Sequence, residues 1–244
     1  YQARKAIGKK GFVYLVEGQF DVLSLHAVGV ENVIAGSGTA FTDEQVRLIT
    51  RFTQQVVMIY DADPAGIKAA LKNCELLLKA GVNVKGVRLP KGKDPDDFAR
   101  ENKAQTEKLL KDKTETFPKL FKKLLLPRGE NAPDVINDVL NDIASLVANV
   151  QDATLRMGYM KELAKDFEMK LDLVDRKVRD LRRNIANVAE KAVMQPGLFG
   201  MDMLQENVEK DKPALLTSIF QNFLDKYGDE PIIYVSGVPV EKPH

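Results

Sequence analysis

Four short apolar segments alternate with three segments of helical periodicity over the first hundred residues, and this alternation restricts the fold more than any other feature. Strands are predicted at residues 12–16, 32–35, 55–60 and 82–89, and helices at residues 20–28, 42–52 and 64–80. Strict alternation of strand and helix is typical of a mainly parallel sheet with helices on both faces. The apolar runs FVYLV and VVMIY lack a clean two-residue period, as expected of strands buried on both sides. We therefore predict an α/β fold with a doubly wound, mainly parallel four-stranded sheet.

The strand pattern stops after about residue 101, and the rest of the chain is helical with polar interruptions. Helices are predicted at residues 103–111, 116–125, 133–150, 153–167 and 171–194. We therefore expect three parts, which are an α/β domain at 1–101, an all-helical subdomain at 102–194, and a linker with a short C-terminal element of unknown role at 195–244.

The counts of cysteine, histidine and charged residues exclude several kinds of chemistry. One cysteine, Cys74, and two histidines cannot form an internal disulfide, a thiolate zinc site or a multi-histidine metal centre. We expect Cys74 to be a buried structural thiol. The 36 basic and 35 acidic residues leave a net charge of +1, so any nucleic-acid contact must depend on local patches. No apolar run approaches the ~18 residues that span a bilayer, so we expect a cytoplasmic protein with no membrane partner.

Acidic residues directly follow three of the four predicted strands. In an open parallel sheet, ligands bind outside the carboxyl ends of the strands. Like charges gathered there repel one another unless cations are present, and oxygen-only clusters suit Mg²⁺ or Mn²⁺. The candidate metal ligands are Glu17, Asp21, Asp61, Asp63, Asp94 and Asp96.

Helix capping is the alternative explanation for each acidic cluster taken alone. Asp63 and Asp94 each precede a proline, as an N-cap residue does, and Asp21, Asp96 and Asp97 fit the first turn of a helix. Capping needs one acid per helix, whereas six acids follow three strands. The combination therefore favours a metal site over caps alone, with Asp97 as a helix-start acid only.

These motifs resemble the TOPRIM domain shared by topoisomerases and primases. The resemblance rests on Glu17-Gly18 with Asp21 four residues later, followed by Asp61-x-Asp63. The segments YQARKAI, GSGTAFT, YDADPAG and GKDPD are similar to those of bacterial DnaG-type primases, and the match covers about residues 1–101. The helical region resembles the C-terminal helical subdomain of the primase catalytic core by position and length.

The resemblance implies synthesis of short RNA primers on a DNA template by two-metal nucleotidyl transfer from NTPs. It implies catalytic roles for Glu17, Asp61 and Asp63, metal binding by all six acids, and Mg²⁺ or Mn²⁺ as cofactor with no zinc in this chain. One ion would activate the attacking hydroxyl and another would hold the triphosphate. Glu17 and Asp61 must then share an ion, which predicts the strand order 2-1-3-4.

The glycine-rich segment GSGTAFT is the candidate nucleotide contact. Its glycines allow backbone N–H groups near Ser37, Gly38 and Thr39 to approach an anion at a helix N-terminus. The alternative is an ordinary strand-to-helix turn with Thr42 as the cap. Lys93 lies beside the acids and would neutralise them or contact phosphate.

The basic stretch Arg176, Lys177, Arg179, Arg182 and Arg183 is expected to be a solvated helix face. Asp172 and Asp175 lie four residues before Arg176 and Arg179, the spacing of intrahelical ion pairs. We therefore do not predict a nucleic-acid site there.

The resemblance also predicts partners, namely a single-stranded DNA template, NTPs and a replicative helicase. The family leads us to expect a zinc-binding domain and a basic subdomain that this sequence does not contain. We therefore expect a fragment, or a chain that relies on another one, with little or no activity alone. Two alternatives stay open, a TOPRIM nuclease that uses the same acids and a non-catalytic replication module in which the acids only cap helices.

Overall fold

The computed structural model describes residues 3–36, 41–60, 64–90, 92–126 and 132–194. Residues 2–184 form one compact unit, and residues from 185 on belong to a second. The predicted linker and terminal element at 195–244 lie outside the described residues. The domain boundaries proposed at residues 101 and 194 stay predictions.

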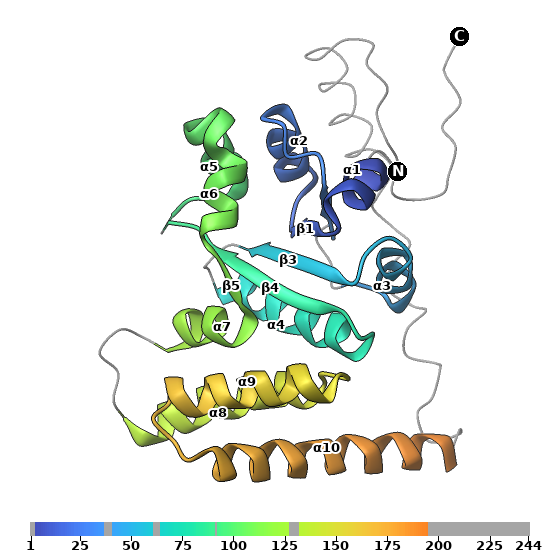
Figure 1. The fold of residues 1–244 in the computed structure, drawn as a ribbon, viewed down its shortest axis with the longest axis vertical. Coiled ribbons are helices and arrows are strands. Elements are labelled where there is room, and N and C mark those ends of the chain that lie inside the picture. The colour runs from blue at the N-terminus through green and yellow to red at the C-terminus, as the bar shows by residue number, and fades with distance from the viewer. Residues whose placement is uncertain (1–2, 37–40, 61–63, 91, 127–131, 195–244) are drawn as a thin grey trace, which may run out of the picture. The chain divides into compact units, whose positions relative to one another are not determined.

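The first hundred residues form the predicted alternation of strands and helices (Figure 1). Each predicted strand lies within one residue of its observed bounds. The elements are α1 (Ala3–Lys10), β1 (Val13–Val16), α2 (Gln19–Ala27), β2 (Val33–Ala35), α3 (Asp43–Thr50), β3 (Gln55–Tyr60), α4 (Pro64–Lys79), β4 (Asn83–Arg88) and α5 (Pro95–Asn102).

The helical region begins with a short 3-10 helix and contains one more strand. Its elements are η1 (Lys103–Gln105), α6 (Thr106–Asp112), β5 (Thr114–Thr116), α7 (Phe117–Leu125), α8 (Pro133–Ala148), α9 (Ala153–Asp166) and α10 (Leu171–Met194). In the part of the chain that the structure describes, no helix is both long and apolar enough to cross a membrane.

The sheet has the order β2-β1-β3-β4-β5. The first four strands are parallel and follow the predicted order, with Leu15 of β1 opposite Met58 of β3 and Tyr60 opposite Arg88 of β4. The prediction of four strands is corrected by β5, which pairs antiparallel with β4. Three residues centred on Glu115 are too short and too polar to be recognised as a strand, and β4 supplies the pairing that holds them.

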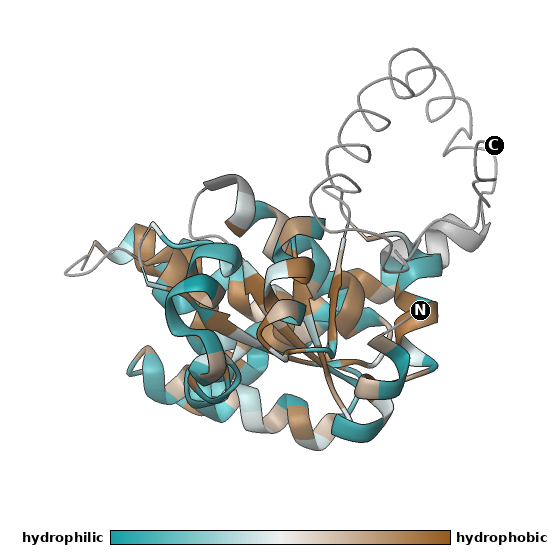
Figure 2. Ribbon diagram, turned by 90° about the horizontal axis from the view of Figure 1, so that it is seen from above, coloured by the Kyte–Doolittle hydropathy of each residue, from teal (hydrophilic) through white to brown (hydrophobic). Residues whose placement is uncertain are grey.

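Alternate residues of the central strands enter two separate cores. Tyr14, Val16, Val57 and Ile59 point to one face, where they pack with residues of α2, α5 and α6. Val13, Leu15, Val56 and Met58 point to the other face, where the core continues through α4 and α7 to α8, α9 and α10. Figure 1 shows these layers, and in Figure 2 the strands are largely brown, the colour of hydrophobic residues. Burial on both sides explains why the strands read as continuous apolar runs.

Glycine at position 86 lets α7 approach the sheet closely. A Cβ atom built on Gly86 would lie 2.2 Å from Cδ2 of Leu120, a buried residue of α7. The helix therefore packs directly on the backbone of β4, which no larger residue would allow without displacement.

A buried amide connects the segment before α3 with the end of β3, at the carboxyl edge of the sheet. Asn73, on α4 and only 2% exposed, accepts a hydrogen bond from the backbone N–H of Phe41 at 2.9 Å. The same amide donates to the hydroxyl oxygen of Tyr60, at the end of β3, at 2.6 Å. Asn73 thus fixes the chain just after GSGTA relative to the chain just before Asp61.

We expect Gly86→Ala to lower the free energy of unfolding by about 1–3 kcal/mol, because the new methyl group overlaps Leu120. Far-UV circular dichroism in urea measures this in a chain without tryptophan. Gly158→Ala is the matched control, since its Cβ meets nothing within 4 Å on helix α9 and should stabilise by up to about 1 kcal/mol. If the loss arises from overlap, adding Leu120→Ala must cost less in the Gly86→Ala background than in the wild type.

We expect Asn73→Leu to cost about 1–3 kcal/mol of unfolding free energy, because the buried N–H of Phe41 loses its acceptor. Tyr60→Phe removes only the second bond of the bridge and should cost less. Urea titrations of both variants test whether Asn73→Leu loses more unfolding free energy than Tyr60→Phe. A wild-type stability for Asn73→Leu would show that the bridge does not hold the two loops.

Candidate functional site

Parallel pairing brings the carboxyl ends of β1 and β3 to one edge of the sheet. The register Leu15 to Met58, continued by two residues, places half-buried Glu17 beside Tyr60, the residue before Asp61. The pKa of Tyr60 is raised to about 12, mainly by burial; the hydrogen bond from Asn73 opposes this rise, and the negative charge of Glu17 contributes to it. Glu17 therefore lies within electrostatic reach of the end of β3. Asp61 and Asp63 lie outside the described residues.

Asp21 is in the first turn of α2, where its carboxylate turns back to the loop after β1. Its Oδ2 accepts a hydrogen bond from the backbone N–H of Gly18 at 3.0 Å. A Cβ atom at Gly18 would lie 3.2 Å from that oxygen, so the small residue permits the close approach. The bond ties Asp21 to Gly18, the residue that follows Glu17 in the chain. It is also the bond expected of an acid in the first turn of a helix.

Asp94 and Asp96 occupy the start of α5 in two different ways. Asp94 is the N-cap residue, and its Oδ1 accepts from the backbone N–H of Asp97 at 2.7 Å. Asp96 accepts hydrogen bonds from Nε of Arg100, at 2.9 Å, and from the hydroxyl of Ser24 on α2. The predicted cap is confirmed at Asp94. Asp96 is instead held against α2, the helix that carries Asp21.

Arg100 is a counterion for Asp96. The two side chains form an ion pair within α5, with Asp96 18% exposed and Arg100 71% exposed. Because the arginine is mostly in water, moving it away from the carboxylate exposes little new surface. Neither Ser24 nor Arg100 was predicted from the sequence. The four-residue spacing of Asp96 and Arg100 was a usable signal, whereas only the fold brings Ser24 to Asp96.

Lys93 forms an ion pair with Glu101 of the adjoining helix, α5. The hydrogen bond and charge of Glu101 raise the pKa of Lys93, and the charges of Asp97 and Asp94 contribute less. The predicted proximity to the acids is thus present, but the pairing partner is a different acid. Contact of Lys93 with phosphate stays a prediction.

The glycine-rich motif was expected to contact the nucleotide through Ser37, Gly38 and Thr39. These residues belong to the segment 37–40, which lies outside the described residues. The predicted capping box after it is confirmed. The N–H of Gln45 donates to Oγ1 of Thr42 at 3.3 Å, and the N–H of Thr42 donates to Oε1 of Gln45 at 3.0 Å. Asn73, which anchors Phe41, was missed. Its signal was an amide among Ala70, Cys74 and Leu77 on the apolar face of a helix.

The donor set at this edge consists of oxygen atoms. The described acids Glu17, Asp21, Asp94 and Asp96 are all half-buried, and no thiol or imidazole was proposed among them. Such a set fits Mg²⁺ or Mn²⁺ and does not fit a structural zinc site. Within the described ranges, no three acidic, histidine or cysteine side chains already gather closely enough to hold a metal. Those ranges do not include Asp61 and Asp63, the two acids at the centre of the predicted cluster.

Comparisons with known proteins agree with this geometry. Residues 14–99 match the family described as Toprim-like. The DNA primase of Aquifex aeolicus is 34% identical over 179 residues, which are 73% of this chain and 34% of that protein. The chain spans about a third of the length of the curated relatives it matches.

Solved structures show the same similarity. The zinc-binding and RNA polymerase domains of Aquifex aeolicus primase superpose with a TM-score of 0.59 at 32% identity, covering 71% of this chain and 41% of that one. A DnaG primase catalytic domain bound to single-stranded DNA gives 0.56 at 26% identity, covering 68% and 54%. The chain is therefore a homologue of the catalytic core of bacterial DnaG-type DNA primases, with a Toprim-like domain at residues 14–99.

Proposed function

We propose that this chain carries the metal-dependent catalytic part of RNA primer synthesis. In that reaction the 3′-hydroxyl of the growing primer attacks the α-phosphorus of an NTP. A new O–P bond forms, the bond to the β-phosphate breaks, and pyrophosphate leaves. The observation that carries the proposal is the parallel pairing of β1 with β3, which brings Glu17 to the edge from which Asp61 and Asp63 follow.

Six carboxylates would hold the divalent ions, namely Glu17, Asp21, Asp61, Asp63, Asp94 and Asp96. Bound ions would lower the pKa of the attacking hydroxyl and offset charge on the triphosphate. Contacts within the protein support two of these acids and the end of β3. Gly18 positions Asp21, Ser24 and Arg100 position Asp96, and Asn73 fixes the end of β3.

The proposed substrates are NTPs and a single-stranded DNA template. Single-stranded DNA is bound by a related DnaG catalytic domain, and this supports the same class of template here. The backbone N–H groups of Ser37, Gly38 and Thr39, together with Lys93, are the proposed contacts to the NTP. A replicative helicase partner also stays a prediction.

One observation favours the non-catalytic alternative. Asp21 and Asp94 each accept a backbone N–H at a helix start, as acids that only cap helices do. Both roles use carboxylate oxygens, and a carboxylate has about four lone-pair sites. Capping and metal binding are thus compatible, and a direct measurement of metal binding decides between them.

We expect Asp96→Asn to weaken Mn²⁺ binding about tenfold or more, because the amide lacks the charge that holds a divalent ion. Asp97→Asn is the matched control in the same helical turn and should change the affinity little. Titration calorimetry with Mn²⁺ measures both, and thermal unfolding confirms that each variant folds. Equal affinities for the two variants would remove Asp96 from the site and favour a purely helix-start role.

We expect the 244-residue chain alone to bind Mn²⁺ but to make little or no primer, because a net charge of +1 attracts a DNA template only weakly. Incorporation of labelled NTPs on single-stranded DNA measures synthesis, and adding a basic template-binding primase subdomain should raise it. Robust primer synthesis by the chain alone, if it persisted in high salt, would contradict this account of template binding. Hydrolysis of the DNA in place of synthesis would favour the nuclease alternative.

A further inference from the structure

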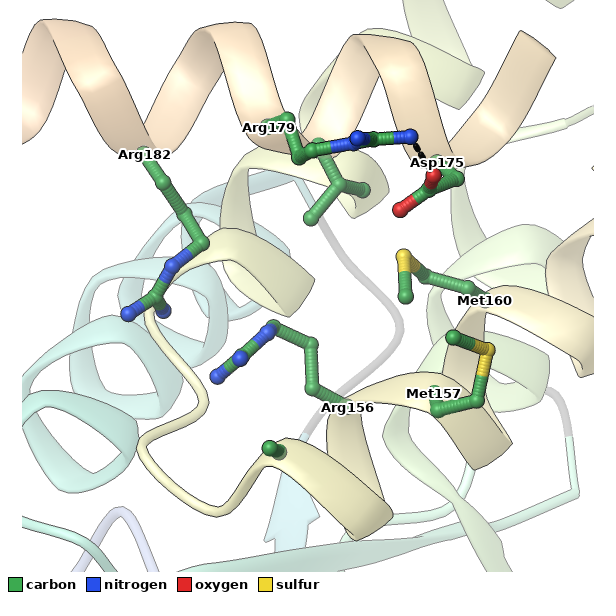
Figure 3. Close-up of a pocket in the computed structure, with 8 residues that line it drawn as sticks. Arg156, Met157, Met160, Asp175, Arg179 and Arg182 are labelled. Atoms are coloured by element: carbon green, nitrogen blue, oxygen red, sulfur yellow. Dashed lines mark hydrogen bonds and ion pairs between the residues drawn. The ribbon is translucent and has the colours of Figure 1, made fainter. Parts of the chain in front are cut away.

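A pocket lies between α9 and α10, in the helical region and outside the acidic edge of the sheet. Its volume is about 350 Å³, and it is open to solvent on one side. It combines three arginines with an apolar wall (Figure 3). The lining residues are Ala153, Arg156, Met157, Met160, Asp175, Val178, Arg179 and Arg182.

Two of these arginines share one backbone acceptor at the end of α8. Nη1 of Arg156 donates to the carbonyl oxygens of Val150, at 2.6 Å, and Gln151, at 3.2 Å. Nη1 of Arg182 donates to the carbonyl oxygens of Ala148, at 2.7 Å, and Val150, at 3.3 Å. The common carbonyl of Val150 holds the two guanidinium groups side by side, as Figure 3 shows. Arg182 therefore does not belong to the solvated face predicted for this helix.

In the described part of the chain, the two adjacent guanidinium groups are bound by carbonyl oxygens and not by carboxylates. Within the described residues, neither Arg156 nor Arg182 forms an ion pair, and both are half-buried. Burial lowers the pKa of Arg156, the charge of Arg182 lowers it further, and the charge of Asp152 opposes this to a smaller extent. Each guanidinium has five N–H donors and uses only Nη1 on the carbonyls. The remaining donors and the mutual repulsion both favour an anion between the two groups.

Two neighbouring arginines of α10 are already paired with carboxylates. Arg179 pairs with Asp175, and Arg183 pairs with Asp180 at 3.6 Å. Lys177 donates to the amide oxygen of Asn141. A nucleic-acid strand needs a continuous track of available cations along its backbone. The guanidinium groups of Arg156 and Arg182 gather their charge in one pocket and not along such a track, which favours a compact ligand.

The other side of the pocket suits an apolar or planar group. Met160 and Val178 are buried, and Met157 is 39% exposed at the opening. Thioether side chains are polarisable and adapt to the shape of a flat ligand. The volume of about 350 Å³ is at the small end of ligand pockets.

We propose that this pocket binds a compact organic phosphate of about mononucleotide size, with the phosphate on Arg156 and Arg182 and the remaining body against Met157 and Met160. Arg179 lies at the same site and adds a third cation when the phosphate competes with Asp175. A bound ligand would connect α9, α10 and the end of α8. It would therefore stabilise the helical region, and the stabilisation would increase with the concentration of free ligand. Binding at this pocket is independent of the proposed catalysis.

The test is calorimetric titration of the 244-residue chain with AMP, inorganic phosphate and adenosine, in EDTA so that divalent ions cannot recruit a nucleotide to the acidic edge. We expect AMP to bind more tightly than either part alone and to raise the melting temperature. Arg182→Gln should weaken AMP binding about tenfold or more, as the loss of a charge-assisted contact does. Arg183→Gln, on the same helix and outside the pocket, is the matched control and should bind as the wild type does.

Two further variants keep the test valid if Arg182→Gln disturbs the end of α8. Arg179 holds no backbone carbonyl among the described contacts, so Arg179→Gln removes charge from the pocket without that risk and should also weaken AMP. Met157→Ala should weaken AMP but leave inorganic phosphate unchanged. Equal AMP affinity in the wild type and in Arg179→Gln and Arg182→Gln would overturn the proposal, as would tighter binding of a single-stranded oligonucleotide than of AMP. Failure of primer synthesis or of Mn²⁺ binding would leave these results unchanged.

Discussion

Parallel pairing between β1 and β3 is the constraint on which the rest of the structure depends. These strands are 39 residues apart in sequence, between Val16 and Gln55, yet they run side by side in one direction. Neighbouring parallel strands end at the same edge of the sheet. The pairing of the strands therefore sets which residues lie close together at that edge. Glu17 and Tyr60, the last residue of β3, are brought together in this way. The helices that return the chain then cover both faces and complete the two cores.

A second set of contacts refines the edge that the strands define. Asn73 fixes two loops through one buried amide, and Ser24 with Arg100 fixes the carboxylate of Asp96. Each of these residues belongs to a helix, so side chains of helices orient polar groups at this edge of the sheet. The same principle applies in the helical region, where α9 and α10 present Arg156 and Arg182 to the end of α8. Hydrogen-bonding side chains carried by helices are thus the second organising element of this protein.

The sequence was informative where the signal was local and periodic. The strand at 55–60 could be predicted because VVMIY is apolar throughout, and the Thr42–Gln45 box because its spacing is fixed by one helical turn. The strand at Thr114–Thr116 could not be predicted, because its three polar residues carry no strand pattern and its pairing with β4 is what stabilises it. The contact between Ser24 and Asp96 joins residues 72 positions apart, and only the packing of α2 on α5 creates it. Within the candidate site, the residue types could be predicted from the sequence, whereas their supporting partners required the fold.

The two outer strands of the described sheet, β2 and β5, are each only three residues long. An edge strand with many unpaired N–H and C=O groups can recruit a strand from another molecule, and short edges limit this. The sheet therefore offers little backbone to an incoming chain at either side. The short edges reduce the risk of strand exchange, and they favour contacts through side chains of the surrounding helices over backbone pairing.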